Sequence, residues 1–112
     1  ILPTKVHFSA DEIIFEEGDK GDTAYLMISG EVWLFQGSVP SQTLLDIKYK
    51  GHVFGELALL DKTPRVAMAK AKTDVSCMMV SRKEFEKRVA DGGSDPIVKS
   101  LIQSMTEHKL KQ

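Results

Sequence analysis

The segment FGELALLDKTPR, residues 54–65, places an acid before a short apolar run and ends on a proline and an arginine. A buried strand has no use for the acid, and a helix interior would not tolerate the proline. Residues 57–60 can instead form one short helical turn that is entered through Gly55 and Glu56. The segment therefore predicts a backbone shaped to hold a ligand.

The chemistry of this segment indicates which groups the ligand carries. Free backbone N–H groups at the start of a helical turn bind anions, and a glycine lets a ligand approach the backbone. Arg65 adds a planar, charged fork that suits a phosphate, and Pro64 restrains the chain just before it. Glu56 would repel a phosphate but can accept hydrogen bonds from sugar hydroxyls. The alternative is that Glu56 and Arg65 form an ordinary surface ion pair, worth about 0–1 kcal/mol.

Short apolar or alternating runs surround the segment and predict many β-strands between about residues 4 and 80. Turn-forming residues separate these runs, and we assign Gly18, Gly21 and Gly30 to turns without a ligand role. Many short strands at this spacing predict a jelly roll, sandwich or barrel. The predicted strands lie at residues 5–8, 12–15, 24–28, 32–35, 44–49, 66–71 and 75–80.

The last third of the chain predicts two helices, at about residues 81–91 and 95–110. Ser81 and Glu84 match a capping box at the start of the first helix. Phe85 and Val89 share one face of that helix, which ends at a pair of glycines. An apolar stripe on the second helix is more typical of a core than of a ligand lid, although it can serve as both. The stripe consists of Ile97, Val98, Leu101, Ile102 and Met105.

Length and composition exclude several classes of protein. The 112 residues suit one domain, and 42% hydrophobic with 28% charged residues is typical of a globular chain. A net charge of -1 gives little electrostatic support for nucleic-acid binding. No apolar run approaches the ~20 residues that cross a bilayer, so we expect no membrane insertion by this segment. Cys77 alone can form neither an internal disulfide nor a zinc site, and we expect it to be buried.

In residue order and spacing, residues 54–67 resemble the phosphate-binding cassette of cyclic-nucleotide-binding domains. These domains occur in protein kinase A regulatory subunits, the catabolite activator protein and cyclic-nucleotide-gated channels. The family pattern is Phe-Gly-Glu, a small apolar helix, then Pro-Arg followed by a small residue and Ala. The upstream run 17–22, with Tyr25 and Gly30-Glu31-Val32, is similar to the first hairpins of the family. The resemblance extends from about residue 6 to residue 105.

The resemblance implies a mainly β fold with α: an antiparallel jelly roll or barrel of about eight strands. A short phosphate-cassette helix and two C-terminal helices complete this single domain, residues 1–112. Arg65 would pair with the cyclic phosphate, and Glu56, aided by the Gly55 backbone, would accept from the ribose 2′-hydroxyl. Leu57 and Ala58 would donate backbone N–H groups. The implied ligand-binding set is Phe54, Gly55, Glu56, Leu57, Ala58, Pro64, Arg65, Val66 and Ala67, and the implied lid is Leu101, Ile102 and Met105.

Val66 departs from the family pattern, which often has Ala, Ser or Thr at this position. Valine has the shape of threonine without its hydroxyl, so one hydrogen bond to phosphate, worth about 0.5–1.5 kcal/mol, is lost. The hydroxyl near this position commonly favours guanine in the family. The resemblance therefore favours cAMP over cGMP as the ligand.

We expect a regulatory sensor that relays cyclic-nucleotide binding through its C-terminal helices to a fused effector domain or a partner protein. No catalytic or metal-binding set is predicted, so we expect no enzyme activity, no cofactor and no direct nucleic-acid binding. The chain opens on Ile1 rather than Met, so we expect a piece of a longer protein. We expect this domain to lie in the cytoplasm. One alternative is a degenerate domain that serves as a structural or interaction module without nucleotide. A remote alternative, a cupin-like metal enzyme, rests on His52 and Glu56.

Overall fold

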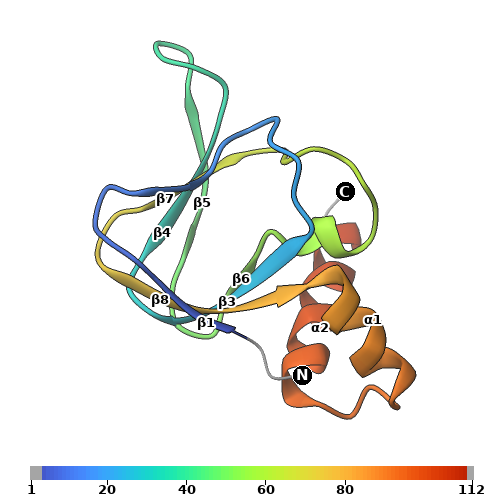
Figure 1. Ribbon diagram of the computed structural model, residues 1–112. Coiled ribbons are helices and arrows are strands. Elements are labelled where there is room, and N and C mark those ends of the chain that lie inside the picture. The colour runs from blue at the N-terminus through green and yellow to red at the C-terminus, as the bar shows by residue number, and fades with distance from the viewer. Residues whose placement is uncertain (1–3, 111–112) are drawn as a thin grey trace.

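The computed structural model describes residues 4–110, and the side chains of residues 4–107. Two four-stranded antiparallel sheets lie against each other, and two helices sit at one end of them (Figure 1). The strand orders are β1-β8-β3-β6 and β2-β7-β4-β5. The elements are β1 Thr4–Phe8, β2 Ile13–Phe15, β3 Thr23–Ser29, β4 Val32–Gln36, β5 Thr43–Lys48, β6 Val53–Phe54, the 3-10 helix η1 Glu56–Leu59, β7 Met68–Ala71, β8 Val75–Ser81, α1 Arg82–Ala90 and α2 Pro96–Leu110.

The prediction of a mainly β chain with two C-terminal helices is confirmed. The barrel alternative is wrong for the described residues, because each sheet keeps two edge strands and the two sheets do not join into a closed ring. One reason is that β6, which the sequence analysis did not predict, is only two residues long and pairs with Tyr25 and Leu26 of β3 alone. Nor do the described residues include a helix long and apolar enough to cross a membrane.

The core between the sheets follows the alternation of side chains along the strands. Met27 on β3 and Cys77 on β8 point inward and are almost fully buried, with 3.7 Å between their sulfur atoms. The ring centroids of Tyr25 and Phe54 lie 4.9 Å apart in a stacked arrangement. Burial raises the pKa of the Cys77 thiol to about 11, and the prediction that Cys77 is buried is confirmed.

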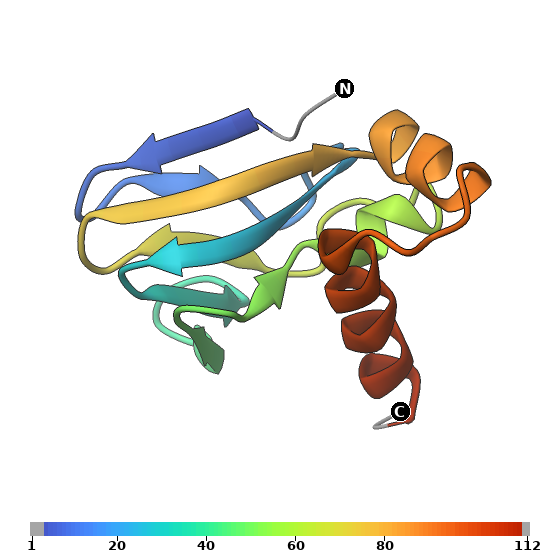
Figure 2. The same ribbon diagram turned by 90° about the horizontal axis from the view of Figure 1, so that it is seen from below.

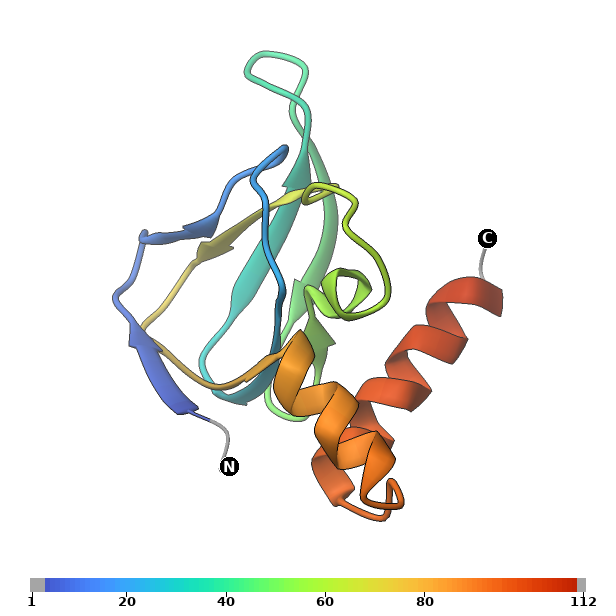
Figure 3. The same cartoon turned by 45° about the vertical axis from the view of Figure 1, so that its right-hand side comes forward.

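A second core lies between η1 and the two helices. Figures 2 and 3 show η1 between the sheets and the helices, so that it contacts both. The residues of this second core come from β3, β6, η1, β8, α1 and α2. Burial of each large apolar side chain among them contributes about 1.5–3 kcal/mol to stability. They are Ala24, Val53, Leu59, Val80, Phe85, Val98, Leu101 and Met105.

Two residues of the predicted apolar helix faces lie outside this core. Val89 lies in the last turn of α1, beside the chain reversal that leads to α2, and is 44% exposed. Ile102 is on α2, on a side that faces away from the second core, and is 43% exposed. Of the apolar residues predicted on the two helices, Phe85, Val98, Leu101 and Met105 therefore lie in this core and Ile97 packs against it, whereas Val89 and Ile102 do not.

Local signals set the ends of α1 as predicted. Ser81 Oγ accepts from the Glu84 N–H at 3.2 Å, and Glu84 Oε1 accepts from the Ser81 N–H at 3.4 Å, which confirms the capping box. After α1, Gly92 and Gly93 have positive φ angles of 112° and 66°, which a glycine adopts without strain. The chain can therefore reverse sharply into α2.

Strand β7 begins at Met68 rather than at the predicted residue 66. The chain just before it is held by other contacts: the Val66 carbonyl accepts from Gln36 Nε2 at 3.1 Å. The Arg65 backbone bonds to the turn between β2 and β3. Residues 65–67 consequently line a cavity before the chain enters the sheet.

Candidate functional site

A cavity of about 330 Å³ lies beside η1, between that helix, strands β4 and β5, and the loop of residues 61–67. All nine residues of the predicted ligand-binding set line it. Phe15, Leu34, Leu45, Asp46 and Lys48 complete most of the remaining wall. Residues 54–58 and 63–67 therefore form much of the wall of a cavity large enough for a small ligand.

Gly55 shapes the entrance to η1. It has a φ of 74°, in the left-handed region, and a Cβ there would lie 2.8 Å from Arg65 Nη1. Its carbonyl accepts from the Ala58 N–H at 3.3 Å. Among the described residues, the Glu56 and Leu57 backbone N–H groups donate to no acceptor, so they are available to a ligand.

Arg65 is a buried cation without a counter-charge. The residue is 9% exposed, and none of the described carboxylates lies within ion-pair distance of it. Nη1 donates to Gly55 O at 3.2 Å, while Nη2 donates to Thr23 O at 2.9 Å and Thr23 Oγ1 at 3.0 Å. Nε is buried with no described acceptor. Burial lowers the pKa of Arg65 below its ordinary value, which means that the site would gain from an anion.

The backbone of Arg65 is held by the turn between β2 and β3. Its N–H donates to Asp19 O at 2.8 Å, and its carbonyl accepts from the Gly18 N–H at 2.8 Å. The guanidinium carbon lies 4.1 Å from the centroid of the Phe15 ring, a cation–π contact.

Gly21 makes room for the Arg65 side chain. A Cβ at this position would lie 2.6 Å from both Nε and Nη2 of Arg65. The assignment of Gly21 to a turn without a ligand role is therefore incomplete, because its lack of a side chain positions the arginine. Sequence reasoning also missed Phe15 and Thr23, because both contact Arg65 from far away in the chain. Thr23, for example, is separated from Arg65 by 42 positions, and no local pattern links residues at that distance.

Glu56 is the second charged group of the cavity that lacks a partner. It is 8% exposed, lines the cavity, and its carboxylate makes no hydrogen bond or ion pair with any described side chain. The alternative of a surface ion pair between Glu56 and Arg65 is wrong, because both are buried and they are not paired. A buried carboxylate of this kind suits hydroxyl or N–H donors of a ligand.

The open side of the cavity is largely apolar. Leu45 and Val66 are 48% and 49% exposed and border it together with Leu34. Asp46 and Lys48 form an ion pair of 3.1 Å on the β5 side. Partial burial acts to raise the pKa of Asp46, but hydrogen bonds from Lys48 and from the Ile47 N–H outweigh it and hold this pKa below its ordinary value.

The predicted lid residues Leu101, Ile102 and Met105 do not line the cavity. Leu101 and Met105 belong to the second core, where η1 contributes Leu59, and Ile102 is exposed. In this arrangement Leu101 and Met105 therefore pack with η1, and none of the three predicted lid residues covers the cavity.

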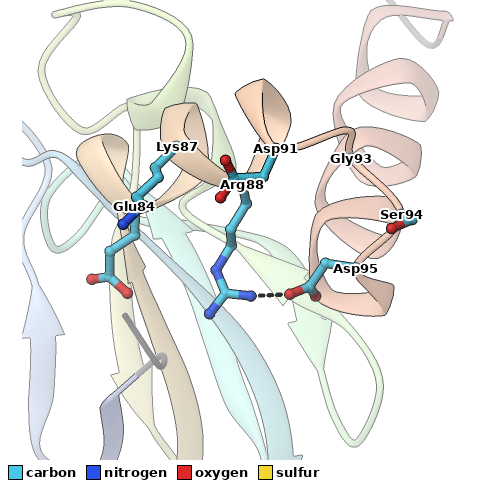
Figure 4. Close-up of a pocket in the computed structure, with 7 residues that line it drawn as sticks. All are labelled: Glu84, Lys87, Arg88, Asp91, Gly93, Ser94 and Asp95. Carbon is cyan, nitrogen blue, oxygen red and sulfur yellow. Dashed lines mark hydrogen bonds and ion pairs between the residues drawn. The ribbon is translucent and has the colours of Figure 1, made fainter.

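A second cavity, of about 270 Å³, lies where α1 turns towards α2 (Figure 4). Arg88 and Asp95 point towards one another and form an ion pair across it. Glu84, Lys87 and Asp91 also line it. None of the predicted site residues is in its wall.

No group of three or more His, Cys, Asp or Glu side chains among residues 4–107 is arranged to hold a metal ion. His52, which suggested the metal-enzyme alternative, instead accepts from the Tyr49 N–H through Nδ1 at 3.0 Å and stabilises the turn before β6.

Comparisons with known proteins agree with this geometry. A cAMP-dependent protein kinase regulatory subunit from Emericella nidulans is 43% identical over 83 residues, which are 73% of this chain and 19% of that protein. The catabolite activator protein of Thermus thermophilus has a TM-score of 0.83 at 26% identity, over 97% of this chain and 50% of that one. The cAMP-bound EAL enzyme Bd1971 has a TM-score of 0.72 at 32% identity, over 94% of this chain and 28% of that one.

The chain spans about a fifth of the length of the first curated relatives that it matches. Residues 5–91 match the family model described as the cyclic nucleotide-binding domain. This match covers most of the chain, which therefore belongs to the cyclic nucleotide-binding domain family.

Proposed function

We propose that the chain is a regulatory sensor domain that binds a cyclic nucleotide, cAMP in preference to cGMP, in the cavity beside η1. The observation that carries this proposal is the buried guanidinium of Arg65, which borders the cavity without an ion-pair partner among the described residues. Burial of an unpaired charge is costly, and neutral carbonyl acceptors compensate it only in part. An anionic cyclic phosphate would supply the missing charge.

In this proposal the two ends of the segment bind different parts of the ligand. Arg65 and the free N–H groups of Glu56 and Leu57 take the phosphate, whereas the Ala58 N–H, which the resemblance implied as a second donor beside Leu57, already donates to Gly55 O. The Glu56 carboxylate accepts from the ribose 2′-hydroxyl, beside Gly55. The domain is then a jelly roll in which η1 serves as the phosphate-cassette helix, with Phe54, Pro64 and Ala67 as further wall residues.

The preference for cAMP rests on the apolar side of the cavity. Leu45 and Val66 offer the base a largely apolar surface, and valine has no hydroxyl to donate. A guanine-selective hydrogen bond from this position is therefore missing, whereas contact between the base and the valine methyl groups is kept. The relatives named above include a regulatory subunit and an enzyme structure with cAMP bound.

Binding would be relayed through the second core, because Leu59 of η1 packs with Leu101 and Met105 of α2. A ligand that favours one arrangement of α2 shifts the population towards it, and Leu101, Ile102 and Met105 could cover the base only after α2 moves. The proposed output lies in a fused domain or a partner protein in the cytoplasm. The domain itself contributes no catalysis and needs no cofactor.

Calorimetric titration with cAMP and with cGMP tests the proposal. We expect binding of both, with cAMP tighter. Arg65→Ala should weaken binding of cAMP by about 30-fold or more, because truncation of one member of a buried charge pair costs about 2–5 kcal/mol and each 1.4 kcal/mol is about tenfold. Lys62→Ala, which removes an exposed charge from the same loop, is the matched control. Absence of binding at high micromolar nucleotide would favour the degenerate, structural module.

A further inference from the structure

Arg82 joins the end of η1 to the start of α1. It is the first residue of α1, yet its guanidinium reaches a segment 21 to 24 residues earlier in the chain. Nε donates to Ala58 O at 3.0 Å, and Nη2 contacts the same carbonyl and donates to Asp61 O at 2.7 Å. Both acceptors belong to the segment that forms one side of the nucleotide cavity.

Few other groups donate hydrogen bonds to the Ala58 and Asp61 carbonyls. The last carbonyls of a short helix lack an intrahelical partner and carry partial negative charge, so a cation beside them is favourable. No described backbone N–H outside η1 donates to Ala58 O or Asp61 O. The arginine fork is suited to two neighbouring acceptors at once, which a lysine cannot bridge in the same way.

The backbone of Arg82 reaches the same turn that holds Arg65. Its N–H donates to Asp22 O at 2.8 Å, and the next residue, Thr23, accepts from Arg65 through its carbonyl and its hydroxyl. Arg65 bonds to Gly55 O at the start of η1, whereas Arg82 bonds to Ala58 O and Asp61 O at its end. Two arginines anchored at one turn therefore hold η1 from both ends.

We infer that Arg82 is a positioning residue that couples occupancy of the cavity to the placement of α1. A ligand that binds the Glu56 and Leu57 N–H groups acts directly on η1. The carbonyls at the end of that helix transmit the change to Arg82, and so to the first turn of α1. This inference rests on the proposed nucleotide binding. Because coupling between two sites is reciprocal, disturbance of Arg82 must also change the affinity for nucleotide.

The first test uses the chain without ligand. The Leu60 and Asp61 N–H groups both donate to Leu57 O, and we expect Arg82→Ala to accelerate their hydrogen exchange by about tenfold. Exchange in β8 should stay as in the wild type. Lys83→Ala removes the next charge along α1, at an exposed position, and should change neither region. Unchanged exchange at Leu60 and Asp61 in the Arg82 variant would overturn the inference, whether or not the chain binds nucleotide.

The second test adds cAMP. In the wild type, saturating cAMP should change the exchange of both η1 and residues 82–90. In Arg82→Ala the affinity should fall on the order of tenfold, and saturation should still protect η1 while residues 82–90 no longer respond. A purely structural defect would instead slow or speed exchange throughout the sheets, and a wild-type response of α1 in the variant would refute the coupling.

Two further variants keep the test decisive if Arg82→Ala does not fold. Arg82→Lys and Arg82→Gln retain most of the aliphatic stem, and Arg82→Lys should recover part of the response because it keeps one charged donor. Equal affinity for cAMP and an equal response of α1 in the wild type, Arg82→Lys and Arg82→Gln would again contradict the inference. Failure of the wild type to bind nucleotide would refute the proposed function, and the ligand-free exchange would then decide the role of Arg82 alone.

Discussion

The cavity beside η1 and the cavity at the turn between α1 and α2 have similar volumes, about 330 and 270 Å³, and an arginine lines each of them. In the cavity at the turn between the helices, Arg88 faces Asp95 and forms an ion pair with it. In the cavity beside η1, Arg65 bonds only to neutral oxygens, and Glu56 has no described partner. In the proposal above, Arg88 already has its counter-charge within the chain, whereas the buried guanidinium of Arg65 would receive one from the ligand.

Gly21→Ala should have the largest effect on the cavity beside η1 among these variants, because the added Cβ would lie 2.6 Å from Arg65 Nε and Nη2. Overpacking of this kind costs about 1–3 kcal/mol. Because the displaced group is the guanidinium that takes the phosphate in the proposal, we expect cAMP affinity to fall by about 5- to 150-fold. Calorimetry measures the affinity, and thermal unfolding shows whether the fold is retained.

Gly18→Ala is the matched control in the same turn. A Cβ there meets no atom within 4 Å, but the φ of +90° strains any L-residue. This variant should lose about 1 kcal/mol of unfolding free energy and keep its affinity for cAMP. An equal loss of affinity in both variants would show that the turn as a whole, and not the space beside Arg65, determines binding.

Glu56→Gln tests the role of the Glu56 carboxylate, the other charge of this cavity without a described partner. The amide keeps the size of the side chain but weakens the acceptor for the ribose hydroxyl, so cAMP affinity should fall by about fivefold. Titration with 2′-deoxy-cAMP, which lacks that hydroxyl, should show equal affinity for wild type and variant. A fivefold loss with the deoxy analogue as well would place Glu56 at another part of the ligand.

Val66→Thr tests the apolar side of the same cavity. The added hydroxyl can form one neutral hydrogen bond, worth about 0.5–1.5 kcal/mol, so the affinity for cGMP should rise about threefold relative to cAMP. Val66→Ala removes volume without adding a donor and should leave the ratio of the two affinities unchanged. A shift in that ratio for the alanine variant would mean that size, and not the hydroxyl, controls base preference.

Features encoded by neighbouring residues could be predicted from the sequence, and features encoded by distant ones could not. The capping box at Ser81 and the motif of residues 54–67 depend on local spacing, and both appear where expected. The contact between Gly21 and Arg65 depends on how two separate turns meet. The exposure of Ile102 likewise depends on the angle at which α2 rests on η1, which periodicity alone does not determine.

Asp95→Asn has the smallest expected effect on binding and tests the cavity at the turn between α1 and α2. The variant removes the charge that faces Arg88 but keeps the Oδ1 acceptor that receives the Ile97 N–H at 2.8 Å at the start of α2. With side chains 15% and 30% exposed, this pair should contribute about 1 kcal/mol or less to the free energy of unfolding.

Asp91→Asn, at an exposed position in the same cavity wall, is the control for a lost negative charge. Both variants should bind cAMP as the wild type does, because neither residue lines the cavity beside η1. A tenfold loss of affinity in Asp95→Asn alone would show that the turn between the helices is part of the nucleotide response, and the two cavities would then have to be treated as one coupled system.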